Sequence, residues 1–166
     1  FRSRFGVNFR LDFYGQDDIE KIIKRSAKLL GVNIEAGAIL AVAKASRFTP
    51  RIANRLLKRV RDYAQMTERE VINSKTTEET LKMLEIDDRG LEETDRKILR
   101  TIAETFDSGP VGLKAVAASI SEEENTIADG YEPYLIQIGF LARTPKGRVI
   151  TREGKKHLGI NSGFDI

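Results

Sequence analysis

Apolar residues recur at helical spacing through most of this chain, and one short charged stretch interrupts the pattern. In the first such segment they are Ile19, Ile22, Ile23, Ala27 and Leu30. Intervals of three and four residues place side chains on one face of an α-helix, so the chain is expected to be mainly helical. The interruption is "EIDDRG", residues 85–90, which is charged, short and closed by glycine. A chain of 166 residues is long enough for two small domains, and this linker predicts a boundary near residue 87.

Four helices are predicted before the linker, after a short strand that ends near Tyr14. The first covers residues 16–30 and ends at Gly31, and the second covers about 35–46. The third begins with Thr49 as its N-cap and Pro50 in its first turn, where a missing N–H group costs nothing. The fourth covers about 76–84. Together they predict a compact, all-helical unit.

Three helices followed by a hairpin are predicted after the linker. The first two cover about 94–106 and 113–120. Ser121 and Glu124 have the spacing of a capping box, which predicts a third helix running toward residue 138, with a kink or break at Pro133. Two β-prone runs then surround "PKG", the pattern of a hairpin. This order predicts a winged helix.

Composition excludes several classes of protein. The chain has no Cys and a single His, so it can build neither a disulfide framework nor a Cys/His zinc site. It has no long apolar run and no secretion-signal pattern, which argues against a membrane protein. Because the sequence starts at Phe1, in a segment already rich in motif-like residues, we expect it to be the downstream piece of a longer protein.

Charge is segregated along the sequence, although the net charge is only +3. Residues 47–61 contain six cations and no acid, and residues 143–156 contain six cations and one acid. Residues 78–95, between them, are strongly acidic. Two separate basic regions therefore predict two anionic partners or two solvated faces.

Arg51 lies in the first turn of the third predicted helix, where a cation opposes the helix dipole at a cost of up to about 1 kcal/mol. A phosphate at this position would compensate the charge of Arg51 and the positive end of the helix dipole. Helix N-termini and arginine side chains each donate hydrogen bonds to phosphates. The alternative is that Arg51 lies on a solvated helix edge.

The hairpin sequence "RTPKGR" places Arg143, Lys146 and Arg148 at and around a tight turn. Such a turn is expected to project its cations into solvent, as the wing of a winged helix does toward a DNA backbone. The alternative is an exposed edge hairpin that charge protects from aggregation. The third helix of this unit begins with acidic residues, so it is not expected to enter a DNA groove.

Sequence motifs for catalysis are missing. The nearest fragment to a phosphate-binding loop, residues 154–156, has Val149 where the earlier glycine belongs and Lys156 where the hydroxyl belongs. His157 lies among lysines and is expected to be a surface residue. The chain is therefore not expected to hold a nucleoside triphosphate, to bind a metal or to act as an enzyme alone.

Six segments occur in a fixed order along the chain: "RSRFG", "LDFY", "TPRIANRLLKRVRDYA", "DRKIL", "GPVGL" and "EPYLIQIGFLARTPKGR". Together they resemble the downstream half of the RuvB family of AAA+ ATPases, which drive branch migration of bacterial Holliday junctions. The resemblance implies the end of an AAA+ large domain at 1–14, a small helical lid domain at 15–86, a winged-helix head domain at 87–160 and a tail at 161–166. The expected fold class is mainly α.

The resemblance implies roles at the nucleotide. Arg4 matches the arginine finger, which acts in trans on the ATP of a neighbouring subunit. Tyr14 matches a residue at the nucleotide pocket, and Arg51 matches the sensor-2 arginine that contacts the phosphates of ATP in its own subunit. The full-length protein is expected to bind ATP with Mg²⁺, whereas no cofactor is expected to bind this chain tightly by itself.

The resemblance also implies DNA contacts and partners. Arg143 and Arg148 match head-domain arginines associated with DNA, and Lys146 lies between them. The full-length protein is expected to be a cytoplasmic bacterial homohexamer, an ATP-hydrolysing helicase that acts in recombination, DNA repair and the SOS response. Its expected partners are double-stranded DNA or a Holliday junction, RuvA through the missing large domain, and RuvC, with no membrane.

The sequence departs from the family pattern at Phe48, where glycine is usual, at Lys146, where arginine is frequent, and at Gly130, where an aliphatic residue is common. Two alternatives remain at this point. One is a winged-helix transcription regulator, which would bind specific sequences. The other is the lid of another AAA+ protein such as a clamp loader, which would lack the "GPVGL" and "EPYLIQ" segments.

Overall fold

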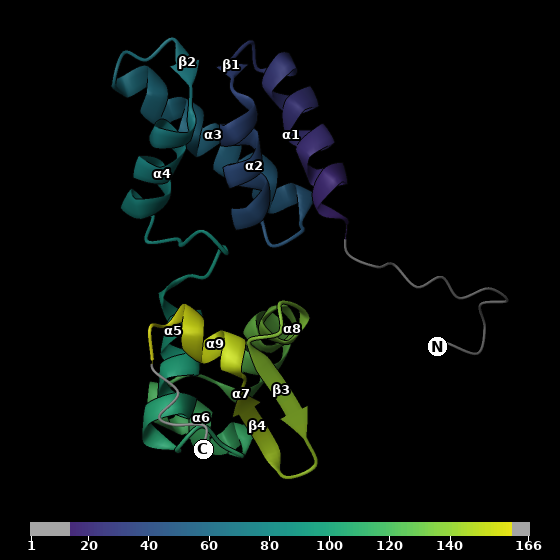
Figure 1. The fold of residues 1–166 in the computed structure, drawn as a ribbon, viewed down its shortest axis with the longest axis vertical. Coiled ribbons are helices and arrows are strands. Elements are labelled where there is room, and N and C mark those ends of the chain that lie inside the picture. Colours follow the sequence, from purple (N-terminus) through teal and green to yellow (C-terminus); the bar gives the residue numbers. More distant parts are fainter. Residues whose placement is uncertain (1–13, 161–166) are drawn as a thin grey trace, which may run out of the picture. The chain divides into compact units, whose positions relative to one another are not determined.

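The computed structural model describes residues 14–160, which divide into two compact units, one ending at Gly90 and one beginning at Leu91. Figure 1 shows the helices and strands of each unit. No helix within residues 14–160 is long and apolar enough to cross a membrane. The strand predicted before Tyr14 and the predicted arginine finger Arg4 lie outside the described residues. The mainly helical fold class is confirmed.

The first unit contains the four predicted helices, which are α1 (Gln16–Leu29), α2 (Ala36–Ala45), α3 (Pro50–Met66) and α4 (Ser74–Met83). They pack around one apolar core, in which α1 and α3 bury the faces that their sequence spacing predicts. Helix α4 contributes Leu81 to this core and buries three threonines beside it. The largest fully buried side chains of this core are Ile19, Ile23, Val42, Leu56, Leu57 and Val60.

A small polar cluster joins α3 to α4. Arg69 forms an ion pair with Glu79 at 2.8 Å, and the Tyr63 hydroxyl donates a hydrogen bond to the same carboxylate at 3.3 Å. The hydrogen bond from Arg69 is the main reason that the pKa of Glu79 lies below its usual range. The cluster therefore holds α4 against the end of α3, as the apolar core also does.

Two short strands in the first unit were not predicted. They are β1 (Asn33–Ile34) and β2 (Val71–Ile72), which pair in parallel, with Asn33 opposite Val71. Two residues are too few to show an alternating pattern, so sequence spacing could not reveal them. They connect the loop after α1 to the loop after α3 (Figure 1).

The second unit begins with α5 (Glu93–Arg100), which continues into the π-helical turn η2 (Thr101–Thr105), and then α6 (Leu113–Ile120). The third helical stretch consists of α7 (Glu124–Thr126), the π-helical turn η3 (Ile127–Tyr131) and α8 (Glu132–Gln137). The second unit ends with the strands β3 (Leu141–Thr144) and β4 (Gly147–Ile150) and the helix α9 (Arg152–His157). The helices followed by a hairpin are confirmed, whereas α9 was not predicted.

The capping box predicted at Ser121 and Glu124 was wrong. Ser121 is the C-cap of α6, with left-handed backbone angles (φ 60°, ψ 42°), and the N-cap of α7 is Glu123. The capping box of this unit lies at the start of α5 instead, where the backbone N–H of Glu92 donates to the Asp95 carboxylate at 2.9 Å. A serine followed three residues later by glutamate therefore spans the end of one helix and the start of the next.

The hairpin is held to the rest of the second unit by a third segment. Val111 exchanges two backbone hydrogen bonds with Arg148, at 3.0 and 2.8 Å. This contact requires glycine on both sides. A Cβ at Gly109 would overlap the Arg148 carbonyl oxygen, and a Cβ at Gly147 would overlap the Val111 carbonyl oxygen. Both glycines also have positive φ, at 88° and 138°.

Gly130 is expected to limit the stability of the second unit. It is exposed in η3, and a Cβ there would meet no heavy atom within 4 Å. Gly130→Ala should raise the free energy of unfolding by about 0.5 to 1 kcal/mol, because alanine lowers the entropy of the unfolded chain and favours helix. Urea unfolding followed by circular dichroism measures this change, and an unchanged or lower value would contradict it.

Candidate functional site

The first turn of α3 has backbone donors that no side chain caps. Thr49 is the N-cap, as predicted, but its hydroxyl donates a hydrogen bond to the Arg47 carbonyl at 3.0 Å and caps nothing in the helix. Ala53 is the first residue whose N–H binds back within the turn, to the Thr49 carbonyl at 3.0 Å. The N–H groups of Arg51 and Ile52 have no acceptor among residues 14–160.

The Arg51 side chain adds an uncompensated charge to these donors. It is exposed, and within residues 14–160 it makes no ion pair. The first turn of α3 contains no acidic residue. The arrangement therefore lacks an internal anion and has the donors and the charge that an external phosphate would need. The geometry alone also fits the alternative of a solvated helix edge.

The turn before α3 is built from left-handed residues. Arg47 and Phe48 have φ angles of 54° and 53°, a region that costs non-glycine residues about 1 to 2 kcal/mol each. Phe48 stands where related sequences were expected to have glycine, which adopts this region without strain. Phe48 therefore forms this turn at a higher backbone cost than glycine would.

Tyr14 is the first described residue and is 52% exposed, directly before the N-cap of α1. Among the described residues no hydrogen bond joins it to Arg51. Two open hollows of about 380 and 410 Å³ lie along α1, and both are bordered by Lys24. Neither of these two hollows is lined by Tyr14 or Arg51.

In the second unit, the hairpin register places two arginines opposite each other. Arg143 is the Cα partner of Arg148 across a two-residue turn that consists of Pro145 and Lys146. Arg148 uses its backbone N–H and C=O on Val111, on its other side, so it faces Arg143 as a non-hydrogen-bonded pair. Side chains of such a pair lie close together, and like charges there are destabilising. The register therefore favours an anion between the two guanidinium groups.

Glu132, at the start of α8, supplies that anion. Arg148 donates to it with both sides of its guanidinium fork, from Nε to Oε1 at 3.2 Å and from Nη2 to Oε2 at 3.0 Å. Arg143 forms an ion pair with the same carboxylate, from Nε to Oε1 at 3.2 Å. One buried carboxylate therefore neutralises part of the charge of two arginines from neighbouring strands.

The three cations of the hairpin differ in exposure. The side chain of Arg148 is 15% exposed and that of Arg143 is 61% exposed, while the Glu132 side chain between them is 3% exposed. Lys146 is exposed in the turn and forms no ion pair within residues 14–160. The hairpin thus presents Lys146 and part of Arg143 to solvent.

Family comparison matches both units of the chain. Residues 14–87 match the RuvB AAA lid domain, and residues 88–159 match the RuvB C-terminal winged helix domain. The chain belongs to the RuvB family.

Two curated RuvB relatives are named Holliday junction branch migration complex subunit RuvB. That of Dehalococcoides mccartyi is 53% identical over 96% of this chain and 46% of its own length, and that of Limosilactobacillus reuteri is 51% identical over 99% and 48%. A structure of the Thermotoga maritima RuvB Holliday junction branch migration motor has a TM-score of 0.92 and 52% identity, covering 96% of this chain and 54% of that one. The chain spans about half the length of the curated relatives it matches.

One expectation about the RuvB wing needs correction. The turn was expected to project Arg143, Lys146 and Arg148 together into solvent, but Arg148 is largely buried against Glu132. The physical reason is the register, which places two arginines face to face, and the carboxylate of Glu132 relieves their repulsion. The contact of all three residues with DNA stays a prediction.

Glu132 is the residue that the sequence reasoning missed. The signal was present, because a two-residue turn at 145–146 makes residues 143 and 148 direct neighbours. Two arginines in that relation favour an acid nearby, although the sequence alone does not say which of the acids before the hairpin supplies it.

Proposed function

We propose that this chain is the lid and DNA-binding head portion of an ATP-dependent, hexameric double-stranded DNA translocase that drives Holliday junction branch migration in recombination and DNA repair. The observation that carries the proposal is the identity of 53% over 96% of the chain with a branch migration complex subunit. The two basic regions of the chain support it, since a motor of this kind must bind nucleotide and DNA.

At the nucleotide, Arg51 would act as the sensor-2 residue of its own subunit. The uncapped first turn of α3 supports this role, because its free N–H groups and the guanidinium would both donate to phosphate oxygens. Tyr14 would line the same pocket, and Arg4 would reach the ATP of the neighbouring subunit. The phosphate-binding loop and the ligands of Mg²⁺ would belong to the preceding large domain.

At the DNA, the proposed contact residues are Arg143, Lys146 and Arg148 of the wing. Cationic contacts to phosphates carry no base information, which suits a motor that must move along any sequence. RuvA, bound through the large domain, and RuvC would be the protein partners, and the ring would be a cytoplasmic homohexamer. The alternative of a transcription regulator is not supported, because the second unit matches the RuvB winged helix.

Salt dependence of DNA binding tests this function on the 166-residue chain. We expect weak binding to a random-sequence duplex, with no preference among sequences. Lys146→Ala should lower the slope of log K against log salt by about 0.9, the value for one phosphate contact. Fluorescence anisotropy at several salt concentrations measures the slope.

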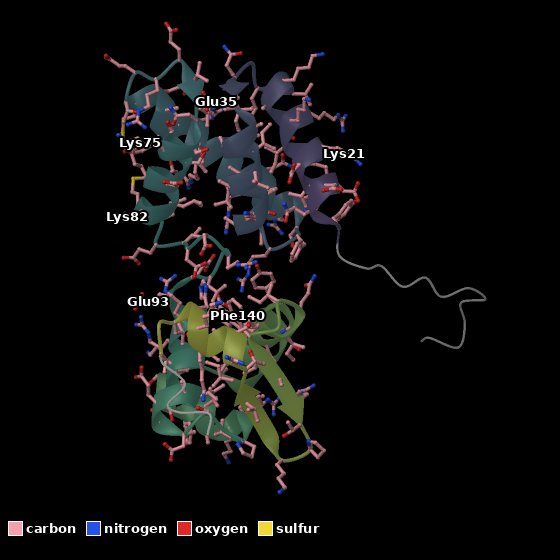
Figure 2. All side chains as sticks on the ribbon, in the orientation of Figure 1. Lys21, Glu35, Lys75, Lys82, Glu93 and Phe140 are labelled. Carbon is pink, nitrogen blue, oxygen red and sulfur yellow. The ribbon has the colours of Figure 1, made fainter. Side chains whose placement is uncertain are left out.

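Lys82→Ala is the matched control, because Lys82 is an exposed lysine on α4 in the first unit (Figure 2). It should leave the slope unchanged. Tight binding to one sequence, or an equal loss of slope in both variants, would contradict the proposed role of the wing.

A further inference from the structure

We propose, resting on the proposed function, that Gly90 is a positioning residue that couples ATP hydrolysis to movement of the DNA-binding unit. Gly90 is the last residue of the first unit, and Leu91 begins the second. The backbone at Gly90 is seated on the end of α2, directly before the turn that leads into α3, the helix of Arg51. A movement of α3 at the nucleotide therefore displaces the point from which the second unit continues.

The Gly90 backbone lies so close to the end of α2 that no side chain fits between them. A Cβ at Gly90 would overlap the carbonyl oxygen of Ala45 and would lie 2.9 Å from its carbonyl carbon. Ala45 is the last residue of α2. Gly90 is buried and has φ 75°, a left-handed angle that glycine adopts without strain. Both the backbone angle and the available space therefore require glycine here.

The segment between α4 and Gly90 is ordered by its own hydrogen bonds. The Ile86 N–H donates to the Leu81 carbonyl at 3.0 Å, and the Ile86 side chain packs against the apolar core of the first unit. Asp87 then accepts two hydrogen bonds, from the Arg89 N–H to its carboxylate at 2.9 Å and from the Gly90 N–H to its carbonyl at 3.0 Å. The predicted linker is thus part of the first unit up to its last residue.

A short series of hydrogen bonds joins this contact to the first turn of α3. Ser46, next to Ala45, is fully buried, and its carbonyl accepts a hydrogen bond from the Thr49 N–H at 3.1 Å. The Thr49 carbonyl accepts in turn from the Ala53 N–H at 3.0 Å. The turn consists only of residues 46–49, and two of them have left-handed backbone angles. Because packed, hydrogen-bonded segments transmit displacement, a shift of α3 reaches the end of α2 and the Gly90 contact.

Gly90→Ala in the full-length protein should push the linker away from the end of α2. We expect ATP hydrolysis to stay within about twofold of the unaltered rate, while the number of Holliday junctions dissociated per ATP hydrolysed falls about 3- to 30-fold, as for loss of a coupling contact. A residue needed only for folding or for the nucleotide site would lower both rates together. Phosphate release and junction dissociation, followed on the same sample, measure the ratio.

Gly31→Ala is the matched control. Gly31 also has positive φ, 65°, in the first unit, but a Cβ there would meet no heavy atom within 4 Å. The variant therefore has the backbone cost of a left-handed alanine without the overlap. It should keep the ratio of the unaltered protein. An equal fall of the ratio in both variants, or an unchanged ratio in Gly90→Ala, would overturn the positioning role.

Insertion of two glycines between Gly90 and Leu91 keeps the test decisive if Gly90→Ala does not fold. The insertion retains the contact with Ala45 and every residue of both units, and it only loosens their connection. We expect the same fall in junctions dissociated per ATP. A normal ratio after the insertion would contradict the proposal, because a fixed point of departure would then be unnecessary. If the unaltered protein dissociates no junctions with ATP, the proposed function itself fails.

Discussion

Gly109→Ala is expected to destabilise the second unit by about 2 to 5 kcal/mol, from about 1 to 2 kcal/mol for a left-handed backbone and about 1 to 3 kcal/mol for steric overlap. Gly109 has φ 88°, and an added Cβ would overlap the Arg148 carbonyl oxygen. The same movement would break the backbone pairing of Val111 with Arg148. Because small domains have marginal stability, this loss is a large share of the total.

Gly139→Ala separates the two contributions to this loss. Gly139 also has positive φ, 75°, but a Cβ there would meet nothing within 4 Å. It should therefore cost only the backbone contribution of about 1 to 2 kcal/mol. Urea unfolding of the 166-residue chain, followed through NMR signals of the hairpin, measures both variants. Equal losses at Gly109 and Gly139 would mean that the close approach to Arg148 has no energetic importance.

Arg51→Ala in the full-length protein is expected to slow ATP-driven branch migration by about 100-fold or more, the usual effect of removing a side chain that stabilises phosphate charge. The same change should leave the stability of the fold unchanged or slightly higher. Arg51 is exposed at the positive end of α3, so its removal relieves an unfavourable charge of up to about 1 kcal/mol. Loss of activity without loss of stability is typical of a residue kept for function.

Lys58→Ala is the control for Arg51→Ala. Lys58 is also an exposed cation of α3, but it lies seven positions after Arg51, about 10 Å farther along the helix axis. It should retain branch migration near the unaltered rate. The wing is untouched in both variants, so both should bind duplex DNA as the unaltered protein does.

The helices and the hairpin could be predicted from the sequence because local patterns determine them. The apolar face of α3, with Leu56, Leu57 and Val60, is visible as spacing and is buried in the structure. The turn at Pro145 and Lys146 is visible between two β-prone runs. Each of these features depends on residues that are close in the sequence.

Features that depend on distant residues could not be predicted. The pairing of β1 with β2 joins residues far apart in the sequence and is too short to leave a pattern. Glu132 precedes Arg148 by a helix and a strand, so their contact depends on tertiary packing. Ser121 has the spacing of a capping box but ends a helix, because local spacing does not distinguish the two uses.

Arg51 and Arg148 show why the sequence could identify a need for an anion but not its source. Each is a cation at a position where its local environment is already positive. At Arg148 the fold supplies the anion from Glu132. At Arg51 no ion pair with a described residue is present, and an external phosphate there stays a prediction.

Whether the chain serves an ATP-driven DNA motor is tested most directly by the rate at which the full-length protein dissociates a synthetic Holliday junction. The rate should depend on ATP and should fall by about 100-fold or more in Arg51→Ala, with DNA binding retained. An unaltered rate in Arg51→Ala, or no ATP-dependent dissociation by the unaltered protein, would contradict this function.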